Sequence, residues 1–206
     1  TEWQQFGTYS YRYSSSYGYL DFYYYVRYAD ISGSSNKKIQ VYTKVVSAKN
    51  YRLSGCPVYW TLNNANQQSD SFSFKNAWDG NSWSTGTYEW EVSYDASGTW
   101  SGTVQGWVQG TGSDYVYDSS DNRSYFTITK SNSQKSASIS LPDLPKYQVK
   151  CECNPLSGGT VTGGGSNLVQ GTSITVTASP NTLYDFVNWT DKNSGDQQTF
   201  HTHLQL

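Results

Sequence analysis

Apolar and aromatic side chains alternate with polar ones through most of the first 145 residues. One face of the segment that begins at residue 20 carries Leu20, Phe22, Tyr24, Val26 and Tyr28. Successive side chains of a strand point to opposite faces, so this alternation predicts strands with one buried and one solvated face. No apolar stripe of helical period runs for more than about two turns. The pattern therefore favours β-structure throughout.

The composition supports the same fold class. Aromatic residues make up 17% of the chain, Gly is abundant and Met is absent. Aromatic side chains suit a pleated, half-buried surface, and Gly, Ser and Asn suit tight turns, which recur roughly every 8–12 residues. We predict an all-β fold whose main part is an immunoglobulin-like or jelly-roll-like antiparallel sandwich, with Trp60 and Trp90 in the core between two sheets.

Two closely spaced prolines mark a domain boundary. Pro142 and Pro145 favour extended backbone and cannot sit in a central strand. We predict a β-sandwich over residues 1–141, a stiff linker over 142–145 and a second, small β domain over 146–206. About 60 residues hold little core, so we expect this second domain to depend on its neighbour or on chain beyond Leu206.

The charge balance excludes several classes of partner. The 14 basic and 16 acidic side chains give a net charge of −2, which does not fit the basic surface of a nucleic-acid-binding protein. The longest apolar run, Phe22–Val26, is far too short to insert across a membrane. The chain opens at Thr1 without Met or a secretory signal, so we expect a processed product or an excerpt.

The cysteines do not form a disulfide framework. Their number is odd and the chain is long, so we predict that Cys56, Cys151 and Cys153 are free thiols; one bridge from Cys56 to either partner is the alternative. If the strands that carry Cys151 and Cys153 paired with those that carry His201 and His203, a Cys₂His₂ zinc site would be conceivable. The spacing is not that of a known zinc finger, so we predict no metal and no cofactor.

Catalytic patterns are weak, and we predict that the chain is not an enzyme. No nucleophile of the first domain has a histidine in its own domain. Glu89 and Glu91 share a strand face at about 7 Å, a separation that glycosidases use. However, this face lies opposite Tyr88 and Trp90, which predicts that it is solvated.

One turn-rich stretch is rich in oxygen ligands. It contains Asp114, Asp118, Asp121 and Asn122. Side chains at such spacing can hold Ca²⁺, but the stretch lacks the EF-hand pattern, which favours a solvated loop.

Four tryptophans are the candidate binding residues. Trp78, Trp83, Trp100 and Trp107 stand beside Gly and Ser, where we expect loops or strand ends. An exposed indole combines an apolar face with a polar tip, which suits a sugar ring or a protein partner. Interior packing or a subunit contact is the alternative interpretation of these residues.

The second domain resembles a known module. The segments that carry the likeness are Tyr147–Val149, Gly158–Val161, Gly163–Gly165, Gly171–Pro180 and Tyr184–Asp191. In this order they resemble the internalin-type B-repeat, a small β-grasp-like unit of extracellular bacterial and phage proteins. The usual closing strand with an Ala-x-Phe ending is not visible after Thr199, which indicates a truncated or divergent copy.

The first domain is similar to minor structural proteins of siphoviruses. The segments Trp78–Gly80, Gly86–Tyr88 and Ser136–Pro145 carry this likeness, although Leu144 stands where that family has Ile. The resemblance implies an immunoglobulin-like sandwich in a non-catalytic structural component of a bacteriophage virion, in the tail, a fibre or the capsid decoration.

Such a component would assemble with other virion subunits as a homo- or hetero-oligomer on an extracellular particle, and would contact a host surface glycan at most weakly. The alternative is a carbohydrate-binding adhesin module of a bacterial cell-surface protein.

Overall fold

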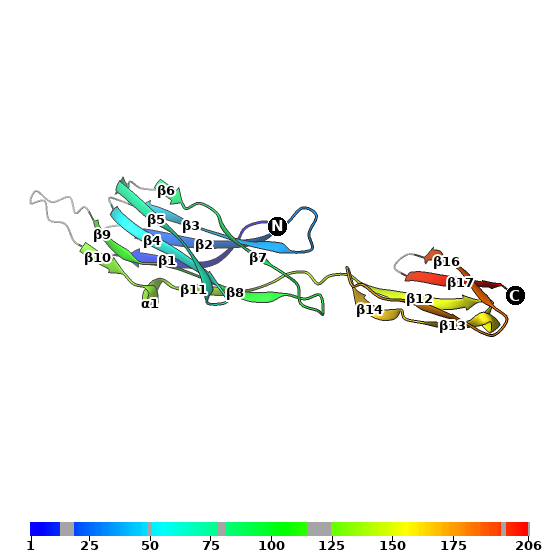
Figure 1. The fold of residues 1–206 in the computed structure, drawn as a ribbon. Coiled ribbons are helices and arrows are strands. Elements are labelled where there is room, and N and C mark those ends of the chain that lie inside the picture. Colours follow the sequence, from blue (N-terminus) through cyan, green and yellow to red (C-terminus); the bar gives the residue numbers. More distant parts are fainter. Residues whose placement is uncertain (13–18, 49–50, 78–80, 115–124, 195–196, 206) are drawn as a thin grey trace, which may run out of the picture. The chain divides into compact units, whose positions relative to one another are not determined.

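The chain folds almost entirely into strands in a computed structural model (Figure 1). The structure describes residues 1–12, 19–48, 51–77, 81–114, 125–194 and 197–205. Within these residues the helical segments are α1 (Lys130–Ser133) and the 3₁₀ turn η1 (Leu156–Gly158). Neither is long enough to cross a membrane. The all-β prediction is confirmed.

The chain divides into two compact units. The first contains residues 1–93 and 100–141, and the second contains residues 94–99 and 142–206. The second unit therefore takes a short segment from within the sequence of the first, in addition to the chain that begins at Pro142.

One sheet of the first unit, sheet A, has five antiparallel strands. They are β1 (Gln4–Arg12), β2 (Tyr19–Asp30), β3 (Lys37–Ala48), β6 (Asn81–Ser84) and β7 (Tyr88–Val92). The first three form a meander, and β6 and β7 pair with successive stretches of β3.

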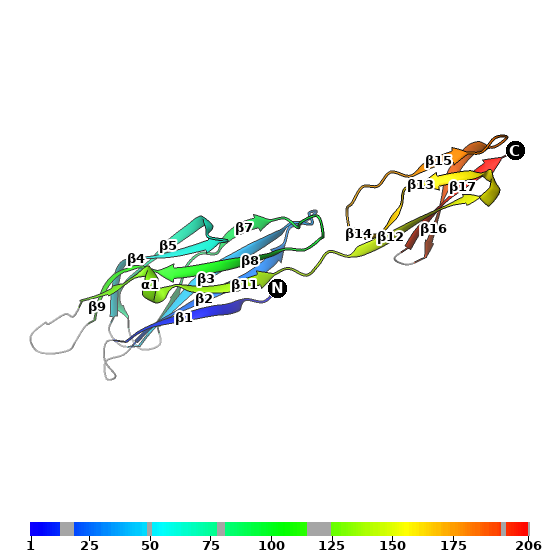
Figure 2. The same cartoon turned by 90° about the horizontal axis from the view of Figure 1, so that it is seen from below.

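The other sheet, sheet B, has six antiparallel strands (Figure 2). They are β4 (Tyr51–Leu62), β5 (Ala65–Ala77), β8 (Ser101–Val108), β9 (Gly110–Asp114), β10 (Tyr125–Ile128) and β11 (Lys135–Ser140). Strand β4 pairs with β5 on one side and with β8 and β9 on the other. The chain passes from one sheet to the other after β3, β5 and β7. The prediction of a sandwich is confirmed, and its finer immunoglobulin-like or jelly-roll-like assignment stays a prediction.

The core lies between the two sheets, on the faces that the alternation predicts. Sheet A contributes fully buried side chains from β2 and β3, and sheet B contributes them from β4 and β8. They include Leu20, Phe22, Tyr24, Ile39, Val41, Val45, Val58 and Val104. Trp60 is fully buried and Trp90 is 7% exposed, so both predicted core tryptophans are confirmed.

The second unit is built on a sheet of four strands, β14-β12-β17-β16. These strands are β12 (Lys146–Asn154), β14 (Gly165–Val169), β16 (Asp185–Ser194) and β17 (Gln197–Gln205). Strands β12 and β17, the first and last of the unit, pair in parallel at the centre, and their outer neighbours are antiparallel to them. A separate pair consists of β13 (Gly159–Thr162) and β15 (Thr177–Pro180).

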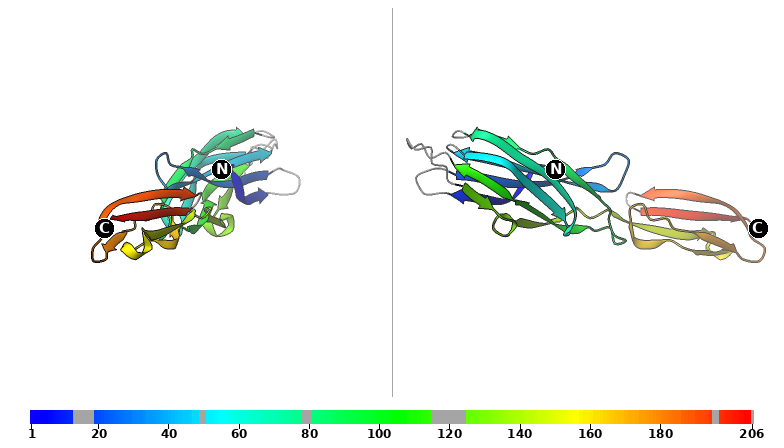
Figure 3. Two further views of the ribbon diagram at one scale, coloured as in Figure 1. Left: turned by 90° about the vertical axis from the view of Figure 1, so that its right-hand side faces the viewer. Right: turned by 60° about the vertical axis from the view of Figure 1, so that its left-hand side comes forward.

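The closing strand that sequence analysis did not find is therefore present. Strand β17 (red in Figure 3) pairs with both β12 and β16, so the expectation of a truncated copy is wrong, and the alternative of a divergent copy remains. Backbone pairing rather than an Ala-x-Phe ending defines it.

Within the second unit, the turn at residues 94–99 packs against Leu144 and Val169. The backbone N–H of Leu144 donates to the carbonyl of Gly98 at 2.9 Å. Gly98 has a φ of +76°, and a Cβ added to it would lie 2.8 Å from Cγ1 of Val169. Only glycine satisfies both the conformation and the close approach at this position.

Candidate functional site

Trp107 lies on β8, on the outer face of sheet B. Gly106 next to it faces the core, against Tyr24 and Trp60. Trp107 nevertheless is only 3% exposed. Its cross-strand partner Tyr59 stacks on it with ring centroids 5.4 Å apart and planes at 22°. Trp107 thus lies at a strand end, as expected, but neighbouring side chains cover its ring, which agrees with the alternative of interior packing and not with an exposed indole.

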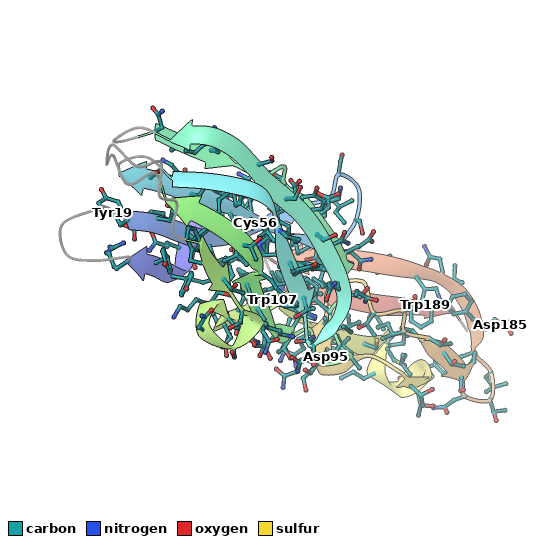
Figure 4. All side chains as sticks on the ribbon, turned by 90° about the vertical axis from the view of Figure 1, so that its left-hand side faces the viewer. Tyr19, Cys56, Asp95, Trp107, Asp185 and Trp189 are labelled. Carbon is teal, nitrogen blue, oxygen red and sulfur yellow. The ribbon has the colours of Figure 1, made fainter. Side chains whose placement is uncertain are left out.

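A cation also covers the Trp107 ring. The Nζ of Lys130, at the start of α1, lies 3.9 Å from the ring centroid. Figure 4 marks Trp107 on this face of the first unit. An ammonium over an indole face is attracted by the ring quadrupole, so Lys130 and Trp107 stabilise each other's position.

Trp107 and Lys130 line a surface cavity of about 200 Å³. The other lining residues are Thr61, Asn64, Ala65, Asn66, Gln67 and Gln105. The lining thus offers amide side chains, a hydroxyl and an ammonium beside one indole ring. The hydroxyl of Thr61 donates to Oε1 of Gln105 at 3.4 Å. Such a mixture suits a small polar ligand with both donors and acceptors.

The β4–β5 turn builds one rim of this cavity. Asn63 and Asn64 have φ values of 52° and 60°, the left-handed conformation that a tight two-residue hairpin turn requires and that asparagine tolerates. Oδ1 of Asn63 accepts a hydrogen bond from the backbone N–H of Thr103 at 2.7 Å. The carbonyl of Asn66 accepts one from Nε1 of Trp90 at 2.7 Å. The rim is therefore held to both sheets.

The α1 turn builds a second rim of the cavity, through Lys130. Thr129 precedes it, and its backbone N–H donates to Oδ1 of Asn132 at 3.0 Å, as in an N-terminal cap. Ser133 is fully buried; its Oγ donates to the carbonyl of Val108 at 2.6 Å and accepts from the N–H of Val108 at 3.2 Å. These bonds fix α1, and with it the backbone of Lys130, against β8.

The other described candidate tryptophans do not join Trp107. Trp83 is half-buried on β6 of sheet A, and Trp100 is half-buried just before β8 of sheet B, where its ring lies close to Gly102. The structure thus does not bring Trp83, Trp100 and Trp107 into one site. The fourth candidate, Trp78, lies outside the described residues.

A second aromatic cluster, on the outer face of sheet A, was not predicted. Tyr25 and Tyr42 stack across β2 and β3 with centroids 4.7 Å apart and planes at 6°. The Trp3 ring meets Tyr42 edge-on at 4.7 Å, and the Arg27 guanidinium lies 4.4 Å from the Trp3 centroid. Desolvation by burial raises the pKa of Tyr42. Only the strand register reveals this cluster, because its members are far apart in sequence.

The two glutamates of β7 have different polar partners. Glu89 binds Lys38 and accepts a hydrogen bond from Nε2 of Gln40 at 2.9 Å, and these bonds lower its pKa. Glu91 accepts instead from Nδ2 of Asn36 at 2.8 Å. Both side chains are exposed, as predicted. A general acid requires a raised pKa, so this arrangement does not favour acid–base chemistry.

The strand pairing that would place the cysteines opposite the histidines of a Cys₂His₂ zinc site does not form. Strands β12 and β17 do pair, but Cys151 is opposite Phe200 and Cys153 is opposite Thr202, whereas His203 is opposite Asn154. No group of three or more His, Cys, Asp or Glu side chains converges among the residues whose side chains the structure describes. Of the candidate calcium ligands, Asp114 ends β9, and Asp118, Asp121 and Asn122 lie outside the described residues.

All three cysteines are free, as predicted. Cys56 is fully buried, and desolvation raises its pKa to about 12. A thiol in this state is a small apolar core side chain and a poor nucleophile.

Comparison with known proteins assigns a family likeness to the second unit. Residues 149–205 match the family model described as a divergent InlB B-repeat domain. No curated protein and no solved structure matches the chain. None of these comparisons supports the siphovirus resemblance of the first domain, which stays a prediction. The second unit is thus similar to B-repeats, which suggests a bacterial surface or adhesion-type module.

Proposed function

We propose that the chain is a non-catalytic adhesion module of a bacterial cell-surface protein and that its β-sandwich binds carbohydrate. The B-repeat match at residues 149–205 is the observation that carries the adhesion role. The carbohydrate role is supported by the cavity beside Trp107, whose lining combines amide side chains with one indole ring.

The absence of catalysis is part of the same proposal. Glu89 and Glu91, the carboxylates at glycosidase-like spacing, are engaged by different partners on an exposed face. We expect no release of reducing ends when the protein is incubated with a panel of bacterial and host polysaccharides. Turnover that disappears in Glu89→Gln or Glu91→Gln would contradict the proposal.

A binding experiment tests the adhesion role directly. The whole chain, labelled with a fluorophore, is applied to an array of host and bacterial glycans and to fixed cells. We expect retention on a subset of glycans and on cells that carry them. A protein that binds neither an arrayed glycan nor any cell surface would overturn this function.

A second candidate is a structural component of a bacteriophage virion that works by assembly with other subunits. It is favoured by large apolar side chains of the second unit that remain exposed, namely Leu156, Leu183, Phe186 and Val187. Light scattering of the purified chain separates the two candidates, because a virion subunit would form defined oligomers and an adhesion module would remain monomeric without losing glycan binding.

A further inference from the structure

The cavity beside Trp107 carries an unbalanced charge. Lys130 is its one cation, and no carboxylate is found among the described residues that line it. Within the described part of the chain, Lys130 also has no carboxylate partner; its side chain lies on the Trp107 ring instead. By contrast, Lys37, Lys38 and Lys150 each pair with an acidic side chain. Lys130 is therefore available to an anionic ligand.

The contact between Lys130 and Trp107 is of the kind that a ligand can replace. A cation–π contact of an exposed lysine is weaker than a charge-assisted hydrogen bond to a carboxylate. An incoming carboxylate can thus draw the ammonium toward itself while the alkyl stem stays anchored by α1. The movement uncovers the part of the ring that Lys130 shields, while Tyr59 remains stacked on Trp107.

The rest of the cavity complements hydroxyl groups. Asn64, Asn66, Gln67 and Gln105 line it, and each amide side chain offers both a donor and an acceptor, the pair that neighbouring sugar hydroxyls require. Both rims are fixed before any ligand arrives, through Asn66 to Trp90 and through Ser133 to Val108. A preformed site loses little entropy on binding.

We infer that this cavity binds a carboxylate-bearing sugar residue of a surface polysaccharide. Lys130 pairs with the sugar carboxylate, the freed face of Trp107 packs on the apolar face of the ring, and the amide side chains bond its hydroxyls. This inference rests on the proposed carbohydrate-binding function and adds its ligand class and its site.

The test compares matched acidic and neutral oligosaccharides. Oligomers of glucuronate and galacturonate, and of glucose and galactose, are titrated into the whole chain in a low-salt buffer and followed by calorimetry. We expect the acidic oligomers to bind at least about tenfold more tightly. We expect Lys130→Met to weaken them about ten- to a hundredfold, as the loss of one charged hydrogen bond predicts. Lys44→Met, which removes an equal charge from the outer face of sheet A, serves as the matched control and should leave their affinity unchanged.

The indole N–H resonances provide a second measurement. Binding in the cavity should shift the Trp107 signal and leave that of the buried Trp60 in place. Lys130→Met, which loses only the cation–π contact, should still unfold cooperatively and within a few degrees of the parent protein. Acetate is added alone, because a simple anion should not shift the Trp107 signal as the sugar acid does.

The outcomes separate this site from the wider function. Equal affinity for acidic and neutral oligomers, no effect of Lys130→Met, or an equal response to acetate would each overturn the inference, although glycan adhesion itself would stand. A protein that binds none of the arrayed glycans and no cell surface would overturn both proposals.

Discussion

The indole Nε1 of Trp60 donates a hydrogen bond of 3.1 Å to Oγ1 of Thr43, and both side chains are fully buried. Trp60 comes from sheet B and Thr43 from sheet A, so this bond joins the two sheets within the core. It explains why a polar residue stands among Val41 and Val45 on the inner face of β3. Without it, a buried indole N–H would lack the partner that water supplies in the unfolded chain.

Replacement of Thr43 by Val should therefore destabilise the first unit by about 1–3 kcal/mol, although the side chain keeps its shape. Urea denaturation followed by tryptophan fluorescence measures the change. Thr43→Ser, which keeps the hydroxyl, is the control and should retain the hydrogen bond while losing only the packing of one methyl group. A Val variant as stable as the parent would show that the bond contributes nothing net.

Ser133, in α1, has a comparable role at the end of β8 in sheet B. Its hydroxyl satisfies both the N–H and the carbonyl of Val108, just where β8 ends. We expect Ser133→Ala to cost about 1–3 kcal/mol of unfolding free energy, because two buried backbone groups lose their partner. The exposed Ser131 in the same turn provides the control. If Ser131→Ala and Ser133→Ala are equally stable in thermal denaturation, the buried hydrogen bonds of the Ser133 hydroxyl contribute nothing net to the stability of the fold.

The inner faces of the sandwich were predictable from sequence because they depend on a local property. Period-two alternation assigns Phe22, Val41 and Trp60 to the core without knowledge of any partner strand. The prediction of a boundary at Pro142 likewise rests on a local property, since proline restricts its own backbone.

The candidate site was predictable only in part, because its properties arise between elements. The burial of Trp107 depends on Tyr59 from β4 and Lys130 from α1, and neither is close to it in sequence. The α1 turn is a single turn of four residues and is too short to show a helical period. The stacking of Tyr25 on Tyr42 likewise follows from a strand register that no local pattern specifies.

The carboxylate of Asp95 organises the turn at residues 94–99 and makes it sensitive to acid. It accepts hydrogen bonds from the backbone and hydroxyl of Thr99 and from those of Ser97, and these bonds lower its pKa from 3.8 to about 2. A folded-state pKa below the unfolded value means that the stabilisation is fully present above about pH 4. It is then lost as the pH falls toward 2.

Titration of the carboxyl ¹³C signal of Asp95 should accordingly give a midpoint near the lower value. Asp95→Asn should remove this contribution to the acid sensitivity of the second unit, and the unfolding midpoints of variant and parent should converge as the pH decreases from 4 to 2. A midpoint at the ordinary value of an aspartate would contradict the role of the turn.

The fully buried thiol of Cys56 should resist alkylation as long as the protein is folded. Its pKa of about 12, compared with a reference value of 9, implies roughly a thousandfold less thiolate near neutral pH, and burial also blocks the reagent. Iodoacetamide at pH 8, followed by mass spectrometry of the peptides, should modify the half-buried Cys151 well before Cys56. In concentrated urea the two rates should become similar. Equal rates in the native protein would mean that β4 opens readily around Cys56, in conflict with a closely packed core.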